Sequence, residues 1–327
     1  MKAFITGAAG FIGMHLSLSL LNDGVDVVGL DNLNEYYDVS LKCSRLKILE
    51  RNKTFKFIKG DLCDRKIIKE IVEENEFDVI VNLAAQAGVR YSLTHPEEYI
   101  NTNLTGFFNI IDAAKEFAVP HFVYASSSSV YGSNTKLPFS EDDKTENQVS
   151  LYGATKKANE LLAHSYSAMY GVKTTGFRFF TVYGPYGRPD MALFIFTKNI
   201  LESKPIKVFN YGDMSRDFTY VDDIVGGIRA LMKDSASLRD NDLPYRVYNI
   251  GNSNPIKLMD FIRAIEKELR KKAIIEYEPM QPGDVQSTSA DVSLLLGDTG
   301  FSPVFTIEEG VHNFISWYCG YYEVKGI

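Results

Sequence analysis

The first sixteen residues constrain the fold of this chain more than any other segment. A short apolar run, residues 1–5, leads into Thr6-Gly7-Ala8-Ala9-Gly10-Phe11-Ile12-Gly13, and an apolar-periodic segment follows. This order predicts a strand, a tight turn and a helix. The three glycines let the turn adopt positive φ, let backbone N–H groups approach a pyrophosphate, and let the helix pack closely on its strand. Because the helix N-terminus then faces the phosphate charge, the pattern indicates a dinucleotide site.

A carboxylate after the second predicted strand supports this interpretation. The strand of residues 25–30 delivers Asp31, close to where a dinucleotide site needs an acid for the adenosine ribose hydroxyls. Asn32 follows, and no arginine or lysine comes directly after Asp31, which favours NAD over NADP. A glycine triplet alone would also fit an ordinary tight turn. The strand, the helix and the acid together favour the dinucleotide.

Strands and helices alternate over the first 180 residues. Apolar periodicity predicts further helices at 40–50, 66–74, 97–117 and 151–170, and further strands at 55–58, 77–85, 121–125 and 173–180. The alternation predicts an α/β fold with a doubly wound parallel sheet, the Rossmann arrangement. Helices at 191–202, 220–233, 257–267 and 307–318 follow a loop rich in glycine and proline. We therefore expect an NAD-binding domain at 1–180 and, interlaced with it, a smaller α/β substrate lobe formed mainly by 181–327.

Further candidate cofactor residues lie near predicted strand ends. Asp61 could accept a hydrogen bond from an adenine amino group, although it could equally cap a helix. Small residues after the strand at 77–85 would let the cofactor lie close to the backbone. The predicted cofactor-binding residues are Gly7, Gly10, Phe11, Ile12, Gly13, Asp31, Asn32, Asp61, Leu62, Leu83, Ala84, Ala85, Asn103, Tyr152 and Lys156.

Composition and charge exclude several classes of protein. The net charge is −7 and the positive residues form no run, which argues against a nucleic-acid or anionic-membrane surface. No apolar stretch reaches about 18 residues and the chain enters its first strand at once, so neither export nor membrane spanning is expected. The 3 cysteines form no C-x-x-C pair and the 5 histidines show no metal-ligand spacing. We expect no metal site and a reducing cytoplasm.

Tyr152 and Lys156 carry the predicted chemistry. They lie four residues apart in the predicted helix at 151–170, so the phenol and the ammonium share one face. A free phenol has a pKa of about 10, so Tyr152 can act as a base near neutral pH only where positive charge stabilises its phenolate. Lys156 and the nicotinamide of NAD can supply that charge. The spacing alone would also fit a surface pair.

Three motifs together resemble the extended short-chain dehydrogenase/reductases that act on nucleotide sugars. They are the glycine turn, the serines that precede Val130-Tyr131-Gly132, and Tyr152-x-x-x-Lys156, and the resemblance covers essentially the whole chain. It implies the catalytic residues Ser127, Tyr152 and Lys156, and a homodimer. Ser127 would hydrogen-bond a sugar hydroxyl, and Tyr152 would take its proton while a hydride passes to NAD and leaves a keto sugar.

The residues after Ser127 distinguish branches of this family. Dehydratases follow the catalytic threonine with Asp-Glu, and decarboxylases on UDP-glucuronate typically carry a glutamate in this segment. Here the residues are Ser128 and Ser129. Without an acid at this point, the expected fate of the keto sugar is rotation and return of the hydride to its other face, which is a 4-epimerase reaction.

Residues 32–38, 178–191 and 280–285 are similar to the UDP-glucuronate 4-epimerase group. Thr181 and Gln281 stand where galactose-type epimerases usually have Asn and Arg. Arg216 matches the family arginine that clamps the diphosphate, a role suited to the forked donors of guanidinium. Arg90 and Arg188 are further candidates for phosphate or carboxylate contact, although each arginine alone would fit a surface charge. The implied substrate-binding residues are Arg90, Ser127, Ser128, Ser129, Tyr152, Thr181, Arg188, Arg216 and Asp284.

The sugar carboxylate has to be bound in both orientations of the rotating ring. Ser127, Ser128, Ser129 and Thr181 could hold it through weak, distributed hydrogen bonds, although Ser128 and Ser129 could instead only cap a turn. The expected activity is NAD-dependent interconversion of UDP-glucuronate and UDP-galacturonate through a 4-keto sugar. Alternatives are a 4-epimerase of neutral or N-acetylated UDP-hexoses, a 4,6-dehydratase, and a binding protein that senses NAD or UDP-sugars. The intact triad argues against the last.

Overall fold

The computed structural model describes residues 1–233, 243–281 and 283–324. The strands are β1 (Lys2–Thr6), β2 (Asp26–Asp31), β3 (Phe55–Lys59), β4 (Val79–Asn82), β5 (Phe122–Ser127), β6 (Thr174–Phe179), β7 (Thr181–Tyr183), β8 (Pro205–Val208), β9 (Ser215–Tyr220), β10 (Tyr245–Ile250), β11 (Pro255–Lys257) and β12 (Ile274–Tyr277). The α-helices are α1 (Phe11–Asn22), α2 (Val39–Leu49), α3 (Arg65–Glu73), α4 (Pro96–Tyr99), α5 (Phe107–Glu116), α6 (Leu151–Tyr170), α7 (Ala192–Leu201), α8 (Val221–Lys233), α9 (Leu258–Leu269), α10 (Ser293–Thr299) and α11 (Ile307–Tyr321). Four shorter helical segments are η1 (Tyr91–Leu93), η2 (Ile100–Gly106), η3 (Ser128–Tyr131) and η4 (Phe209–Gly212).

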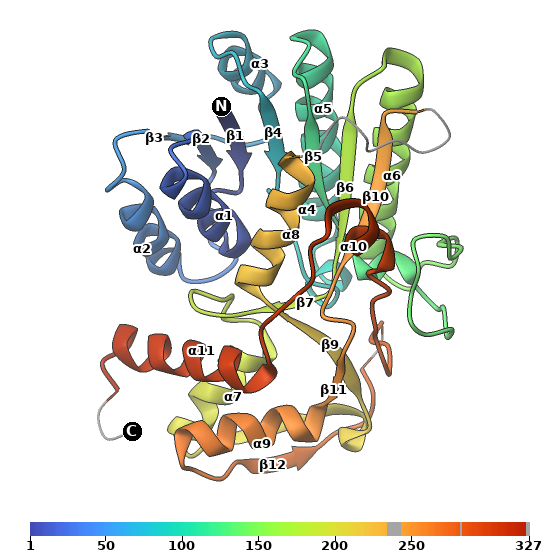
Figure 1. Cartoon of the computed structure of the whole chain (residues 1–327). Helices are drawn as coiled ribbons and strands as arrows, with labels where there is room; N and C mark the ends of the chain where they lie inside the picture. Colours follow the sequence, from blue (N-terminus) through green and yellow to red (C-terminus); the bar gives the residue numbers. More distant parts are fainter. Residues whose placement is uncertain (234–242, 282, 325–327) are drawn as a thin grey trace.

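A seven-stranded sheet forms the centre of the molecule (Figure 1). Its order is β10-β6-β5-β4-β1-β2-β3, and every neighbouring pair is parallel. The chain runs outward from β1 to β3 on one side and from β4 to β6 on the other. The crevice of a doubly wound sheet opens where the order reverses, here between β1 and β4. The predicted fold class is confirmed.

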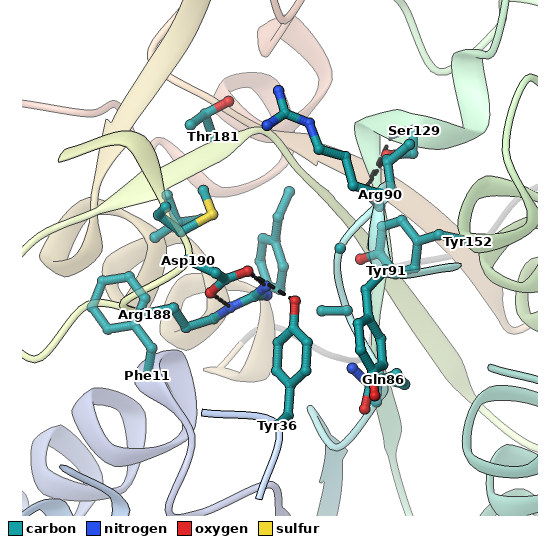
Figure 2. A pocket seen from close by; sticks show the side chains of 18 of the residues that line it. Phe11, Tyr36, Gln86, Arg90, Tyr91, Ser129, Tyr152, Thr181, Arg188 and Asp190 are labelled. Carbon is teal, nitrogen blue, oxygen red and sulfur yellow. Dashed lines mark hydrogen bonds and ion pairs between the residues drawn. The ribbon is translucent and has the colours of Figure 1, made fainter. Parts of the chain in front are cut away.

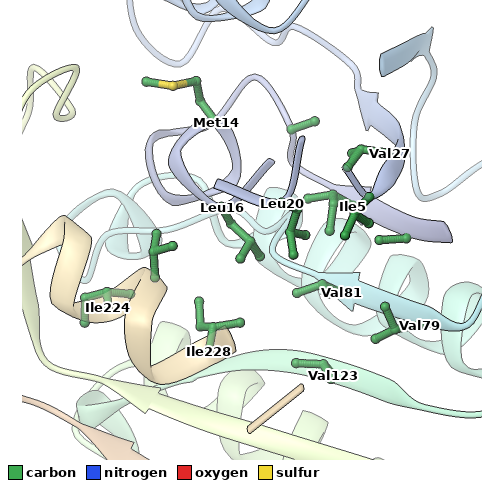
Figure 3. Close-up of a cluster of buried hydrophobic side chains, with 14 of the residues drawn as sticks. Ile5, Met14, Leu16, Leu20, Val27, Val79, Val81, Val123, Ile224 and Ile228 are labelled. Atoms are coloured by element: carbon green, nitrogen blue, oxygen red, sulfur yellow. The ribbon is translucent and has the colours of Figure 1, made fainter. Parts of the chain in front are cut away.

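Strand side chains alternate between two helical layers. Ile5 and Val81 point to a layer that contains α1, α2, α8 and α10, whereas Phe4 and Ile80 point to α3, α5 and α6. Figure 3 shows the first layer, where Leu16 of α1 lies with the α8 side chains over the aliphatic strand residues. Because both faces of the sheet are covered, its strands are apolar on both sides, which explains their near-continuous apolar runs.

A smaller lobe lies below the carboxyl ends of the central strands (Figure 1). It contains a sheet of order β11-β9-β7 and the parallel pair β12 and β8. The helices α7, α9 and α11 share a separate core around Phe194, Phe261 and Phe314. Within the described ranges, no helix is long and apolar enough to cross a bilayer, and no cluster of three or more His, Cys, Asp or Glu could hold a metal ion.

One predicted helix differs in the structure. The helix predicted at 97–117 is three segments, because the π-helical η2 separates α4 from α5. The wider turn leaves the Asn103 carbonyl for another partner, and it accepts a hydrogen bond from Asn159 of α6 at 2.6 Å. In addition, α8 and β10, both beyond residue 180, pack with the first domain, and β10 pairs with β6. The division at residue 180 remains a prediction.

Candidate active site

A cavity of about 1330 Å³ lies between the central sheet and the smaller lobe (Figure 2). Single drug-sized ligands occupy pockets of roughly 300–1,000 Å³, so this cavity has room for more than one such ligand. Every cofactor and substrate residue proposed from the sequence lines it, except Asn103. Asn103 is buried, with its amide bonded to the Gln86 backbone and the Thr155 hydroxyl. It braces the loop after β4 against α6.

The glycine turn meets the requirements of a pyrophosphate site. Gly7 has φ +72°, and a Cβ on it would lie 2.8 Å from the backbone N of Ala84. A Cβ at Gly13 would lie 2.0 Å from the Gly7 carbonyl oxygen. Gly10 is the N-cap of α1 and makes no side-chain capping bond, and the first turn carries no acidic residue. The helix N-terminus therefore offers backbone donors and positive potential to an anion, which fits NAD.

Backbone N–H groups hold the Asp31 side chain at the end of β2. Its carboxylate accepts hydrogen bonds from the Ala9 N–H at 3.2 Å and the Leu33 N–H at 2.9 Å. Lys42 of α2 lies nearby, with its Nζ 4.0 Å from the Asp31 carboxylate and 2.6 Å from Asn34. The sequence prediction considered only residues directly after Asp31, so it missed this cavity-lining ammonium. The Leu- and Lys-rich composition of the helix was the available signal.

Asp61 does not cap α3, so that alternative is wrong. The N-cap is Asp64, which accepts hydrogen bonds from the N–H groups of Lys66 and Ile67. Asp61 instead accepts from the Asn32 side chain and the Cys63 N–H, each at 2.8 Å. Asn32 and Asp61 thus lie together on the cavity wall beside Asp31, where adenosine recognition was predicted.

The residues of the predicted triad lie on two adjacent elements. Ser127 ends β5, and its Oγ accepts from the Ser129 N–H at 3.2 Å, capping the turn of η3. Tyr152 and Lys156 lie in the first turns of α6, which packs tightly on that turn, since a Cβ at Gly153 would lie 2.7 Å from the Ser129 carbonyl oxygen. Ser128 and Ser129 lie within the capped turn, and both still line the cavity with Tyr152.

Burial shifts the pKa values of Tyr152 and Lys156. It lowers the pKa of Lys156 to about 8, while the Lys156 ammonium donates to the Ala125 carbonyl at 2.9 Å. Burial also raises the pKa of the Tyr152 phenol, against a hydrogen bond with Ser127 and the positive charge of Arg188. A bound cation next to Tyr152 is therefore needed before its phenolate forms easily near neutral pH, and a nicotinamide ring would supply that charge.

A buried ion pair behind Ser127 was not found from the sequence. Arg178 of β6 makes two hydrogen bonds of 2.9 Å to Glu160 of α6, and Ser126 donates to the same carboxylate at 2.7 Å. Arg178 also donates to the Tyr131 hydroxyl. Burial opposes ionisation of Glu160, but the Arg178 charge prevails and lowers the pKa of this carboxyl group. The network fixes the strand end that carries Ser127, the predicted catalytic serine.

Two of the three predicted substrate arginines, Arg90 and Arg216, lie at the other end of the cavity. Arg90 pairs with Asp284 at 3.1 Å and lies over the Phe209 ring. Arg216 donates to the Ser215 and Gln286 carbonyls, both at 2.9 Å, and burial lowers its pKa. These two arginines approach one another from opposite lobes. Pro282 of the predicted motif at 280–285 lies outside the described residues.

Arg188 forms a separate pair near Tyr152. Its guanidinium binds the Asp190 carboxylate, which also accepts a hydrogen bond from the Tyr36 hydroxyl at 3.0 Å (Figure 2). Neither Asp190 nor Tyr36 was proposed as a site residue from the sequence. Both lie inside segments noted for their resemblance, 178–191 and 32–38, which was the only available signal.

Comparisons with known proteins agree with this geometry. Residues 3–251 match the NAD dependent epimerase/dehydratase family. A probable UDP-glucuronate 4-epimerase of Rhizobium meliloti is 46% identical over 97% of this chain and 97% of its own length. Protein CapI of Staphylococcus aureus is 50% identical over 99% of this chain and 100% of its own.

A solved structure shares the whole architecture. UDP-glucuronic acid 4-epimerase from Bacillus cereus, in complex with UDP-glucuronic acid and NAD, superposes with a TM-score of 0.91 at 34% identity. The superposition covers 98% of this chain and 100% of that one. The glycine turn, the Ser-Tyr-Lys constellation and the sequence match lead to one assignment: this chain belongs to the NAD dependent epimerase/dehydratase family.

Proposed function

We propose that this chain is a 4-epimerase that interconverts UDP-glucuronate and UDP-galacturonate with NAD held in the cavity. The observation that carries the proposal is the turn Ser127–Ser129, which faces Tyr152 without an acidic side chain. An acid there would serve elimination of water, whereas hydroxyl groups leave the keto sugar intact. The names of the Rhizobium and Bacillus relatives support the same substrate.

The cofactor would occupy the half of the cavity built by β1 to β4. The N-terminus of α1 would bind the pyrophosphate, and Asp31 would accept hydrogen bonds from the adenosine ribose. Asn32 and Asp61 would contact the adenine. When bound, NAD accepts a hydride from C4 of the sugar and returns it to either face.

The residues of the chain handle the proton. Tyr152 takes the proton of the 4-hydroxyl group as the hydride leaves, and gives it back when the hydride returns. Ser127, which hydrogen-bonds Tyr152, orients the same hydroxyl. The buried ammonium of Lys156 stabilises the phenolate electrostatically, an effect that is strong because water is largely excluded around it.

The uronate carboxylate would bind between Thr181 and the serine turn, with Arg188 near enough to contribute charge. Arg216 would bind the diphosphate, with Arg90 beside it. Because the carboxylate has to be released and bound again as the ring rotates, several modest hydrogen bonds suit the reaction better than one strong clamp.

The test is to incubate the purified protein with UDP-glucuronate, UDP-glucose and UDP-N-acetylglucosamine and to separate the products by chromatography. We expect UDP-galacturonate from the first and much slower turnover of the others. Faster turnover of a neutral sugar would identify the neutral epimerase, and loss of water would identify a dehydratase. Binding of NAD and UDP-sugars without any turnover would identify a sensing protein.

The cofactor part of the proposal has its own test. An epimerase regenerates NAD⁺ in every turnover, so we expect NAD(H) to copurify with the protein and to be released on denaturation. Stoichiometric NADP in the released material would contradict the proposal, and so would a strict need for added NAD with net NADH production.

We also propose a cytoplasmic homodimer formed through α5 and α6. These helices pack together, and α6 exposes more than half of the apolar side chains of Leu161, Met169 and Tyr170, which an interface would bury. Cys43, Cys63 and Cys319 are free thiols, which suits a reducing compartment. Light scattering after size exclusion should give twice the chain mass, and Leu161→Asp should reduce it. Cell fractionation tests the compartment.

A further inference from the structure

Three segments that are far apart in the sequence meet at Arg188. Arg188 and Asp190 lie in the loop between β7 and α7, and Tyr36 lies between β2 and α2. Arg188 Nε donates to one Asp190 oxygen at 3.0 Å, Nη2 donates to the other, and the Tyr36 hydroxyl donates to that second oxygen at 3.0 Å. Figure 2 shows this group in the cavity opposite Tyr152.

The surroundings leave this group little freedom. The Arg188 side chain is 21% exposed and Asp190 is 33% exposed. The Arg188 guanidinium also lies over the Tyr36 ring, 5.7 Å from its centroid. Gly88, from the loop after β4, approaches from another side, since a Cβ on it would lie 3.0 Å from the Tyr36 hydroxyl and 3.6 Å from Arg188 Nη2. The pair is therefore held by the cofactor half of the molecule as well as by its own loop.

The hydrogen bonds occupy one particular edge of the guanidinium. A guanidinium offers a carboxylate two bidentate edges, one formed by Nε and one Nη nitrogen, the other by its two Nη nitrogens. Asp190 takes the Nε/Nη2 edge. The remaining edge, Nη1/Nη2, is the one left for a second anion. Burial alone would raise the pKa of Asp190, but the Arg188 charge lowers it, so the pair is ionised and nearly neutral overall.

We propose that Asp190, held by Tyr36, is a positioning residue that limits how strongly Arg188 binds the sugar carboxylate. Asp190 fixes the guanidinium plane, withholds one bidentate edge and neutralises most of its charge. The substrate carboxylate then meets one edge of a neutral pair instead of a free cation. This inference rests on the proposed function, because it requires a uronate substrate.

Weak binding at this point serves the rotation step. A free buried arginine would bind the uronate carboxylate in one pose through a strong, charge-assisted pair, and the ring would have to break that pair before turning. With Asp190 as permanent counter-ion, the free-energy difference between the bound and the released substrate carboxylate is smaller, so Arg188 can release it more easily. The specificity for a uronate is kept because the remaining N–H donors still suit an anion.

The first experiment measures KM and kcat of Asp190→Asn with UDP-glucuronate. Asparagine is nearly isosteric and can still accept the Tyr36 hydrogen bond, but it lacks the charge. Freed of its counter-ion, Arg188 should bind the substrate more tightly, so we expect KM to fall by about tenfold, with kcat falling as well, since the pose is held too firmly. A role limited to structure would raise KM or lower kcat alone, and either result would overturn the proposal.

A matched control and a double-mutant cycle sharpen this result. Asp260→Asn removes a carboxylate that also pairs with an arginine, Arg263, but on the exposed face of α9, so KM and kcat should not move. In an Arg188→Gln background, Asp190→Asn should change neither constant further, because Asp190 acts only through Arg188. Independent, additive effects of the two substitutions would contradict the proposal.

A second variant covers the case in which Asp190→Asn does not fold. Tyr36→Phe removes only the hydroxyl that holds Asp190, and it should lower KM for UDP-glucuronate in the same direction by a smaller factor. Melting temperature and NAD content report whether each variant is folded. An unchanged KM and kcat in folded Tyr36→Phe, together with failure of Asp190→Asn to fold, would count against the proposal.

Measurements on the wild-type protein distinguish failure of the proposed function from failure of the positioning role of Asp190. If it does not convert UDP-glucuronate, the proposed function fails before any variant is compared. If it does convert UDP-glucuronate while Asp190→Asn shows no fall in KM, the proposed function stands and the positioning role of Asp190 is wrong. A fall in KM of similar size with UDP-glucose, which has no carboxylate, would also overturn this role.

Discussion

The two ends of the cavity hold charge in different ways. At the predicted cofactor end, the Asp31 carboxylate accepts hydrogen bonds from two backbone N–H groups, and the predicted anion site is the backbone at the start of α1. At the substrate end, charged side chains are paired with each other, Arg90 with Asp284 and Arg188 with Asp190. Backbone donors at a helix N-terminus meet an anion with no counter-ion beside them, whereas an arginine that is paired with a carboxylate offers a second anion only its remaining N–H donors.

This difference matches what each end has to do. A cofactor that is regenerated in every turnover benefits from a fixed site. A sugar ring that rotates in the site between two hydride transfers needs contacts that can be broken and formed again at a small cost in free energy. The triad lies at the junction of the two ends, on β5 and α6.

The largest expected effect comes from the junction itself. Tyr152→Phe removes the base and keeps the ring, so kcat should fall by roughly 10²–10⁴-fold, or more, while folding and NAD content survive. Steady-state turnover of UDP-glucuronate and the NAD released on denaturation are the measurements. Near-normal turnover in Tyr152→Phe would remove the basis of the mechanism.

The next largest effect should be on NAD binding at the cofactor end alone. Gly13→Ala places a methyl group against the Gly7 carbonyl, and relieving an overlap of this kind costs roughly 1–3 kcal/mol. We expect about a tenfold or greater loss of bound NAD. Gly320→Ala on α11 is the matched control, since a Cβ there meets nothing within 4 Å. Equal NAD content in both variants would show that the turn is not the pyrophosphate site.

A pH experiment tests how strongly burial acts on Lys156. The pKa is about 8 in the folded protein against 10.5 ordinarily, so between these values the unfolded chain binds the extra proton. The free energy of unfolding should therefore rise with pH across this window, by up to about 3 kcal/mol. Urea unfolding at a series of pH values, wild type minus Lys156→Met, isolates this contribution. A difference independent of pH would mean that burial does not lower the pKa of Lys156 in the folded protein.

The smallest effect should be on substrate binding and turnover at the substrate end alone. Thr181→Ala removes one hydroxyl from the predicted carboxylate site. One hydrogen bond is worth about 0.5–1.5 kcal/mol, which corresponds to roughly a two- to tenfold fall in kcat/KM for UDP-glucuronate. A less firmly held carboxylate can align with the carbonyl π system, so decarboxylated pentose product should increase. NAD content should stay constant. If Thr181→Ala kept the kcat/KM and the product ratio of the wild type, the assignment of the carboxylate site to Thr181 would be wrong.

Most candidate residues of the cofactor end could be proposed from the sequence alone, because the pattern that indicates them is local. Turn glycines, a helix start and an acid at the end of the next strand follow one another within about thirty residues, and a parallel sheet brings strand ends to one edge. Periodicity likewise located the long helices. It could not detect the π-helical turn of η2, because one extra residue per turn leaves almost no trace in a pattern of apolar residues.

Only the tertiary structure decided the substrate end. Tyr36 and Asp190 are 154 residues apart, and no local pattern relates them. The same holds for Lys42 beside Asp31, which depends on the angle of α2, and for Arg178 with Glu160, which depends on α6 packing against β6. Such pairs arise from how separate elements pack against one another. The sequence determined which chemical groups the chain possesses, and packing determined which of their charges face one another.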